Sequence, residues 1–432
     1  MSRLRSTLPG RHLQVVDIPW DRCLQANDHV VCSHMSSEPS ALLASLAANG
    51  PDRALRIMMG VPFTQAIVNA PAAYEITCLG GMGSAAAMAE HRRMQVSMLP
   101  YGQISRVYED GRWPVDVVLV SLARSSSGRL YLGASHGSVL AATRRARCVI
   151  AEINQQAPCI LGAEWPEDLR IDLCVDVSHE PAPVSSDEPG EVERAMAGHI
   201  AELVPDGACL QVGIGGLPSA VLQALEGHRH LGVHSGMFTA PMQRLCEKGV
   251  IDNSRKQRDV GISVTGCVLG DASTYRFASG NTSLRLREAD YTHNSDVIAS
   301  QPDFFSINSA LEVDLLGHVN AETVEGAEGR WRYVGGVGGL PEFVRAASTA
   351  KRGQSVMALS SRTPKGKPKI VARLSGPTTV AAADVDRVVT EQGVAVLRHA
   401  GVGQRVQQML AVAHPEDREA LTAQARKLGL LN

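Results

Sequence analysis

The stretch of this sequence best suited to chemistry is a glycine turn between two short β-prone runs, residues 209–212 and 231–234. A strand, a glycine turn and a helix N-terminus leave backbone N–H groups unpaired, and without β-carbons a ligand can approach them closely. Pro218 can occupy the first position of the helix that follows. The pattern predicts a site for a phosphate or a developing oxyanion. The turn consists of Gly213, Ile214, Gly215, Gly216 and Leu217.

The same motif returns far down the chain. Residues 213–218 read GIGGLP, and residues 336–341 read GVGGLP and lead into a second helical pattern. Two such units suggest that two glycine turns face one pocket. A plain tight turn and a chance repeat in a chain with 40 glycines are the alternatives. The dinucleotide-binding fingerprint is not met, because Pro218 stands where that motif needs glycine.

Composition narrows the class of protein. The chain has 432 residues, of which 44% are hydrophobic and 20% charged, with a net charge of −2. These values are typical of a globular protein with two or three domains, and they favour neither nucleic acid nor an anionic membrane as a partner. No C-x-x-C pair occurs among the nine cysteines, so we expect free thiols and no metal site. Residues 1–16 lack a signal-peptide core, so we expect a cytoplasmic location.

Strand and helix patterns alternate along the chain. Residues 115–122 read VDVVLVSL, a near-continuous apolar run typical of a buried parallel strand. The alternation predicts an α/β fold with mostly parallel sheets. A stretch rich in proline, serine and acid, residues 178–191, is the clearest linker. We therefore expect one domain at 1–185 and a second, carrying both glycine loops, at 186–432.

Several segments together carry a resemblance to a known family. In the second half they are LQVGIGGLPSAVLQAL (210–225), LGVHSGMF (231–238), SINSALEVDLLGHVNAE (306–322), GGVGGLPEFVRAA (335–347), VMALSSRTPKGKPKIV (356–371), VVTEQGVAVLR (388–398) and AHPEDREAL (413–421). Looser matches in the first half are HMSSEPSALLASL (34–46), CVIAEINQQAP (148–158) and VDVSHEPAP (175–183). The set resembles the acetyl-CoA hydrolase/transferase family, the class I CoA-transferases that include 4-hydroxybutyrate CoA-transferases.

The resemblance implies two tandem CoA-transferase-type α/β domains with the active site between them, in a homo-oligomer that is often a dimer. In this family a glutamate attacks the acyl-CoA thioester, and a second carboxylic acid collects the CoA. Acyl-CoA and a small carboxylic acid would be the substrates, with no permanently bound cofactor. By matching, Gly338 and Gly339 would stabilise the oxyanion. The first loop would bind CoA together with Leu311, Gly335 and Lys365; a solvated loop is the alternative for Lys365.

One position departs from the family pattern. The nucleophilic glutamate belongs to a motif like H-S-E-M, and here the motif reads His234-Ser235-Gly236-Met237. Glycine has no side chain to acylate, so the usual covalent chemistry cannot use Gly236.

Three interpretations remain open. Another carboxylate could substitute, with Glu312 the first candidate and Asp314, Glu38 and Glu342 weaker ones. Alternatively, water or a carboxylate could attack directly, which would make the protein an acyl-CoA hydrolase or a transferase without a glutamyl intermediate, with His234 as a candidate general base. In the third interpretation the protein binds acyl-CoA without turning it over.

Overall fold

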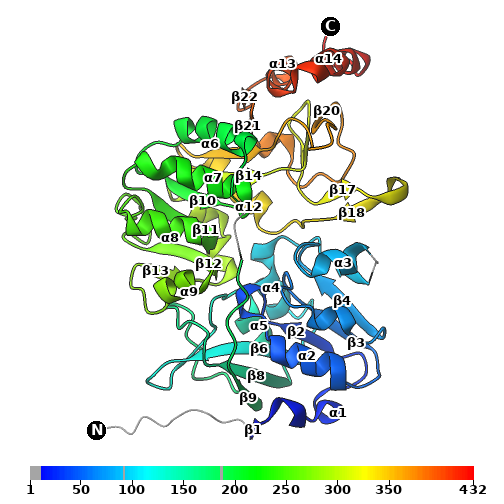
Figure 1. The fold of residues 1–432 in the computed structure, drawn as a ribbon, viewed down its shortest axis with the longest axis vertical. Coiled ribbons are helices and arrows are strands. Elements are labelled where there is room, and N and C mark those ends of the chain that lie inside the picture. Colours follow the sequence, from blue (N-terminus) through cyan, green and yellow to red (C-terminus); the bar gives the residue numbers. More distant parts are fainter. Residues whose placement is uncertain (1–10, 91–92, 185–187) are drawn as a thin grey trace. The chain divides into compact units, whose positions relative to one another are not determined.

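Buried strands and helices form two units in the computed structural model, which describes residues 11–90, 93–184 and 188–432 (Figure 1). Unit 1 comprises the chain through Val184 together with Val264–Tyr291, and unit 2 comprises Ser185–Ser263 and Thr292–Asn432. The expected boundary at residue 185 falls at 185–187, outside the described residues, and stays a prediction. The sequence did not suggest that Val264–Tyr291 would group with the first unit.

Unit 1 is built on a parallel sheet whose strand order is β1-β9-β8-β6-β2-β3-β4-β5, with β7 antiparallel on β6. The apolar run predicted as a buried strand is β6, buried from Val117 to Ala123. The prediction of a mostly parallel α/β sheet is therefore confirmed. The strands are β1 (Arg11–Leu13), β2 (His29–Cys32), β3 (Leu55–Met58), β4 (Tyr74–Cys78), β5 (Met94–Val96), β6 (Val117–Arg124), β7 (Leu130–Tyr131), β8 (Cys148–Asn154) and β9 (Leu173–Val177).

Helices and the later segment complete unit 1. Leu42, Leu43 and Leu46 of α2 are fully buried in its apolar core. The segment Val264–Tyr291 joins the unit through backbone hydrogen bonds, including that from the N–H of His136 to the carbonyl of Gly266 at 2.9 Å. The helices are α1 (Trp20–Cys23), α2 (Ser40–Asn49), α3 (Ala85–Glu90), α4 (Ile104–Glu109), α5 (Val139–Thr143), α9 (Ala272–Ala278) and α10 (Ala289–Thr292), and the later segment also carries β12 (Ser263–Leu269) and β13 (Leu284–Leu286).

Unit 2 has a second, mostly parallel sheet in which six strands follow the order β11-β10-β14-β19-β21-β22. Only β21 and β22 pair antiparallel along this run. The strands are β10 (Cys209–Val212), β11 (Gly232–Thr239), β14 (Phe304–Ser309), β19 (Gln354–Ala358), β21 (Arg387–Thr390) and β22 (Gly393–Val396). Small sheets are formed by β15 (Glu312–Asp314), β16 (Val319–Asn320) and β20 (Ile370–Val371), and by β17 (Thr323–Glu325) and β18 (Trp331–Tyr333).

Helix positions in unit 2 refine two expectations. The first glycine loop leads into α7, which begins at Gly216, so Pro218 is its third residue and not its first. Proline is tolerated there because the first-turn N–H groups have no partner within the helix. The second loop follows β18, a strand of the two-stranded sheet. The helices are α6 (Glu191–Leu203), α7 (Gly216–Ala224), α8 (Ala240–Glu247), α11 (Ser295–Ala299), α12 (Leu340–Thr349), α13 (Val402–Val412) and α14 (Arg418–Lys427).

Candidate active site

The first glycine loop connects β10 to α7 and presents open backbone. Gly215 is exposed, has a φ of +112°, and has nothing within 4 Å of where a β-carbon would lie. Gly213 pairs with the sheet through its N–H, which donates to the carbonyl of Ile307 at 3.2 Å. Within the part of the chain that the structure describes, the N–H groups of residues 214–217 have no such backbone acceptor. The loop can therefore receive an anionic group, as predicted for a helix N-terminus.

A buried amide network lies beneath this loop, at the carboxyl ends of β10 and β14. Gln211 accepts hydrogen bonds from the Ser306 hydroxyl at 2.7 Å and from the Asn308 side-chain nitrogen at 2.9 Å. Its own nitrogen donates to the Asn308 oxygen at 3.0 Å. In open α/β sheets ligands bind outside the carboxyl ends of strands, and a satisfied network fixes the backbone there. This network was not predicted from the sequence, although Ser306 and Asn308 lie in one of the recognised segments.

Gly236 lies within β11 and is partly exposed. A β-carbon added there would lie 3.2 Å from Nε2 of His293 and 3.6 Å from the ring of Phe343. The histidine ring therefore occupies space next to the position where the family pattern has glutamate. Sequence reasoning missed His293, because it lies between two short helices, outside every recognised segment.

The second glycine loop approaches the same histidine. Gly338 has a φ of +52° and open space around it, and Gly339 is the N-cap of α12. A β-carbon at Gly339 would collide with the His293 ring. No backbone acceptor is present, among the residues described, for the N–H groups of Gly338 and Gly339. The structure thus brings Gly236 and the predicted oxyanion loop together around one imidazole.

His234, the candidate general base, is fully buried, and its Nε2 lies 3.0 Å from the carbonyl oxygen of Thr292. A carbonyl oxygen accepts, so this nitrogen carries the proton and donates. Burial lowers the pKa of His234 to about 4, with a smaller lowering from Lys256. This geometry gives Nε2 of His234 the role of holding the backbone next to His293.

The candidate carboxylates have partners of their own. Glu312 accepts from the backbone N–H of Ser375 at 2.7 Å and from its hydroxyl at 2.9 Å. Asp314 accepts from the N–H of His318 at 2.9 Å and closes a turn. These contacts hold the two acids in structural positions, and a catalytic role for Glu312 stays a prediction.

Glu38 belongs to unit 1. Its carboxylate accepts from the N–H groups of Phe63 at 2.6 Å and Thr64 at 3.1 Å. Burial raises the pKa of Glu38, although these hydrogen bonds oppose the shift. Glu342, in contrast, lies in the first turn of α12, one residue before Phe343.

Three further residues were matched to CoA contacts. The N–H of Leu311 donates to Asn320 at 2.9 Å, and Gly335 packs so closely on the carbonyl of Ala321 that a β-carbon would not fit. Lys365 is exposed, and the structure gives it no ion pair among the residues it describes. Its neighbour Lys367, by comparison, pairs with Glu325.

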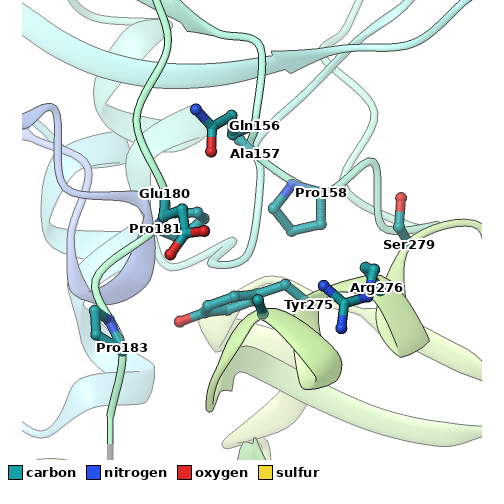
Figure 2. Close-up of a pocket in the computed structure, with 10 residues that line it drawn as sticks. Gln156, Ala157, Pro158, Glu180, Pro181, Pro183, Tyr275, Arg276 and Ser279 are labelled. Atoms are coloured by element: carbon teal, nitrogen blue, oxygen red, sulfur yellow. The ribbon is translucent and has the colours of Figure 1, made fainter.

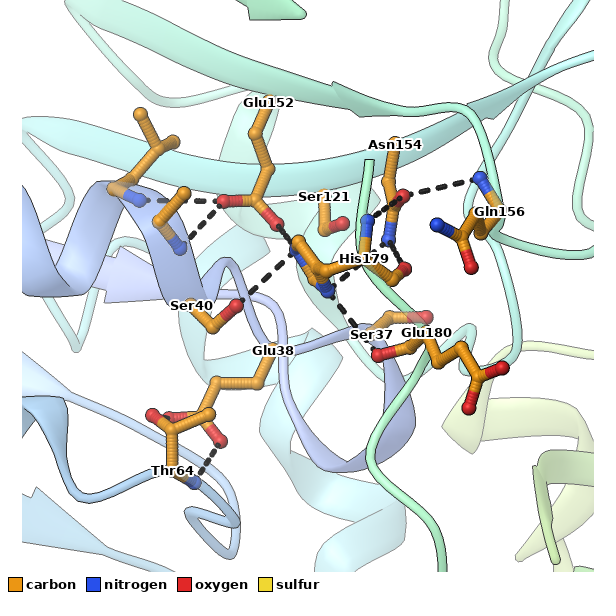
Figure 3. Close-up of polar contacts among 12 residues, drawn as sticks. Ser37, Glu38, Ser40, Thr64, Ser121, Glu152, Asn154, Gln156, His179 and Glu180 are labelled. Atoms are coloured by element: carbon orange, nitrogen blue, oxygen red, sulfur yellow. Dashed lines mark hydrogen bonds and ion pairs between the residues drawn. The ribbon is translucent and has the colours of Figure 1, made fainter. Parts of the chain in front are cut away.

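In unit 1 the three recognised segments of the first half converge on one polar cluster (Figure 3). Glu152, which is fully buried, accepts from the N–H groups of Ala41 and Leu42 at the start of α2. His179 lies 3.4 Å from Glu152 and 3.2 Å from the Ser40 hydroxyl, and this contact with Glu152 raises the pKa of His179. The segments thus share a helix-capping role that joins β8, α2 and the chain after β9.

A pocket of about 250 Å³ opens beside this cluster (Figure 2). Its charged and polar lining comes from Glu180, from Gln156 and from one face of α9. The Tyr275 hydroxyl donates to the carbonyl of Ala182 at 3.0 Å. The lining residues are Gln156, Ala157, Pro158, Glu180, Pro181, Pro183, Ala272, Tyr275, Arg276 and Ser279.

In residues 11–90, 93–184 and 188–432, no three histidine, cysteine or acidic side chains group as metal ligands would. In the same residues, no helix combines the length and apolar character needed to cross a membrane.

Comparisons with known proteins agree with this fold. Residues 270–425 match the model of the acetyl-CoA hydrolase/transferase C-terminal domain. The chain is 33% identical over 329 residues to the 4-hydroxybutyrate coenzyme A transferase of Clostridium kluyveri, covering 75% of this chain and 76% of that protein.

Solved structures extend the likeness to almost the whole chain. RipA from Yersinia pestis superposes with a TM-score of 0.88 at 25% identity, covering 97% of this chain and 98% of that one. A 4-hydroxybutyrate CoA-transferase from Porphyromonas gingivalis gives 0.78 at 29% identity with the same coverage. The fold and the sequence similarity together define a protein of the CoA-transferase class. The chain belongs to the acetyl-CoA hydrolase/transferase family.

Proposed function

We propose that this protein is an enzyme that processes acyl-CoA thioesters and moves CoA between an acyl-CoA and a carboxylic acid. The observation that carries the proposal is the pair of glycine loops in unit 2. Both present backbone N–H groups without backbone acceptors among the described residues, and one of them meets Gly236 around His293. Such groups can bind the CoA phosphates at one loop and the oxyanion of the cleaved thioester at the other.

The finer assignments rest on the family match. Residues 213–217, Leu311, Gly335 and Lys365 would contact CoA, and Gly338 and Gly339 would stabilise the oxyanion. By the same match, the substrates are an acyl-CoA and a small carboxylic acid, and no permanently bound cofactor takes part. We propose that the working form is a cytoplasmic homo-oligomer, for which a dimer is the simplest arrangement.

Hydrolysis is a second candidate, favoured by one observation. Residue 236 has no carboxylate to form the glutamyl intermediate, and Gly236 itself is partly exposed. Water could then attack the thioester carbonyl directly, and a carboxylic acid would no longer be required as an acceptor.

Mass spectrometry of the purified protein separates these outcomes. The protein would be incubated with acetyl-, butyryl-, succinyl- and 4-hydroxybutyryl-CoA, each with and without a mixture of carboxylic acids. New acyl-CoA species that depend on the added acids would identify CoA transfer, and free CoA without them would identify hydrolysis. Unchanged substrates in protein that still binds CoA would contradict the proposal.

A further inference from the structure

The space that the family's glutamate would use is bordered by a different ionisable group. Nε2 of His293 would be 3.2 Å from a β-carbon at Gly236, and Cε1 would be 3.4 Å from it. The same ring lies against Gly339 of the second loop, where no β-carbon would fit. His293 is thus the ionisable side chain that the structure places against both predicted reaction positions.

The ring is held in one orientation. Nδ1 lies 2.8 Å from the Thr292 hydroxyl, and the ring centroid lies 4.7 Å from that of Phe343 at an interplanar angle of 56°. His234 fixes the carbonyl of Thr292 at 3.0 Å. The Thr292 hydroxyl can donate to Nδ1 or accept from it, and in the tautomer in which Nδ1–H donates to this hydroxyl the lone pair is on Nε2. Nε2 is the nitrogen that faces Gly236.

We propose that His293 is the catalytic base of this enzyme and that water is the group it activates, an inference that rests on the hydrolysis candidate of the proposed acyl-CoA function. Nε2 takes a proton from water while the water oxygen bonds to the thioester carbonyl carbon. The N–H groups of Gly338 and Gly339 hold the resulting oxyanion. When the C–S bond breaks, the CoA sulfur leaves with the bonding pair and takes the proton from Nε2. The products are CoA with a free thiol and the carboxylic acid.

The neighbouring groups support this role. Gly236 has no side chain to compete for the approach to His293, and both Gly236 and Gly339 are partly exposed. His293 itself is only 6% exposed, so its imidazole is largely shielded from bulk solvent. General bases within hydrogen-bond reach of water are the usual way to hydrolyse a thioester without a covalent intermediate.

The test compares two matched substitutions in the full-length chain. His293→Gln removes the base and keeps a polar side chain, whereas His199→Gln makes the same change on α6, away from both glycine loops in sequence. Steady-state release of CoA from acetyl- and butyryl-CoA is followed with a thiol reagent. We expect His293→Gln to lower kcat by ~100-fold or more with KM changed by less than ~3-fold, because general-base catalysis contributes about that much. His199→Gln should match the wild type.

Each result bears on one claim. Wild-type kcat in folded His293→Gln would overturn the role of His293 and leave the acyl-CoA function standing. A wild type that releases no CoA and transfers none would overturn both. If thermal denaturation shows that His293→Gln is unfolded, Gly236→Ala decides the question, because its methyl group would press on Nε2. Unchanged kcat in Gly236→Ala would overturn the proposal, and a fall of ~10-fold or more with little change in KM would support it.

Discussion

A β-carbon at Gly236 would lie 3.2 Å from Nε2 of His293, so residues 236 and 293 share one small space. That separation is tighter than ordinary van der Waals contact. A glutamate at 236 would therefore require the His293 ring to shift by a few tenths of an ångström. Gly236, the departure from the family motif, therefore lies in contact distance of His293, and mutagenesis should change the two residues together.

Restoring the family nucleophile tests this coupling. We expect Gly236→Glu alone to produce little CoA transfer, because the new side chain meets the His293 ring. The double variant Gly236→Glu, His293→Gly should show more transfer than either single variant. The measurement is acid-dependent formation of new acyl-CoA by mass spectrometry. Equal transfer by Gly236→Glu with and without the second change would contradict the shared space.

The second glycine loop should tolerate no side chain at Gly339. Gly339→Ala would drive its methyl group into the His293 ring, and overpacking of this kind costs ~1–3 kcal/mol of stability. We expect a folded protein with strongly reduced CoA release, measured by the thiol assay. Gly403→Ala on α13 is the control, since nothing lies within 4 Å of its β-carbon position. Full activity in Gly339→Ala would remove this loop from the site.

Glu312 can be assigned by comparing it with its partner. If Glu312 only holds Ser375, then Glu312→Gln and Ser375→Ala should each lower the free energy of unfolding by ~1–2 kcal/mol and leave kcat nearly unchanged. Urea denaturation and the thiol assay measure the two quantities. A large loss of kcat in Glu312→Gln alone would make Glu312 the substitute carboxylate.

Lys365 and its neighbour Lys367 allow a paired test of contact with CoA. Lys365 is exposed, whereas Lys367 already pairs with Glu325. We expect Lys365→Ala to raise KM for acyl-CoA by ~3- to 10-fold with little effect on kcat. An interaction that is equally strong in the ground state and in the transition state changes KM alone. Lys367→Ala should change KM less. Equal effects of the two substitutions would favour a general surface charge over a specific contact.

Three buried histidines should make the protein sensitive to acid. Burial lowers the pKa of His34, His136 and His234 to about 4, from 6.5 when unfolded. Between these values the unfolded chain binds protons that the folded chain does not, so stability falls as pH drops from 6.5 toward 4. Over this range, each pH unit of acidification lowers the free energy of unfolding by up to about 1.4 kcal/mol per histidine.

His234→Gln isolates one of these histidines. The difference in unfolding free energy between the wild type and the variant should shrink as pH falls from 7 to 5. Urea denaturation at both values measures it. A difference that stays constant would mean that His234 is not held neutral.

The sequence predicted the parts of the fold that depend on local pattern. The apolar run at Val117 indicates a buried strand, and the glycines around Gly215 indicate a turn. Both could be predicted because strand burial and backbone freedom depend on the types of a few adjacent residues. The grouping of Val264–Tyr291 with the first unit was missed, since it depends on backbone hydrogen bonds such as His136 to Gly266 across 130 residues.

Some residues of the candidate site could likewise be predicted from local motifs, and others could not. The motif HSGM located Gly236, and the repeated GxGGLP motif located Gly339. His293 has no motif of its own, and only the folded chain brings it between them. Glu312 was a reasonable candidate from sequence, but its hydrogen bonds to Ser375 could not be predicted from spacing.

One measurement tests the central claim that this protein cleaves acyl-CoA without a carboxylate at residue 236. The purified wild type would be incubated with acetyl- and butyryl-CoA in ¹⁸O-labelled water, with and without carboxylic acids, and all products weighed by mass spectrometry. Hydrolysis through His293 predicts consumption of acyl-CoA and one ¹⁸O atom in each released acid, whereas transfer predicts new acyl-CoA species that depend on the added acids. Acyl-CoA that remains intact under every condition, in protein that binds CoA, would contradict it.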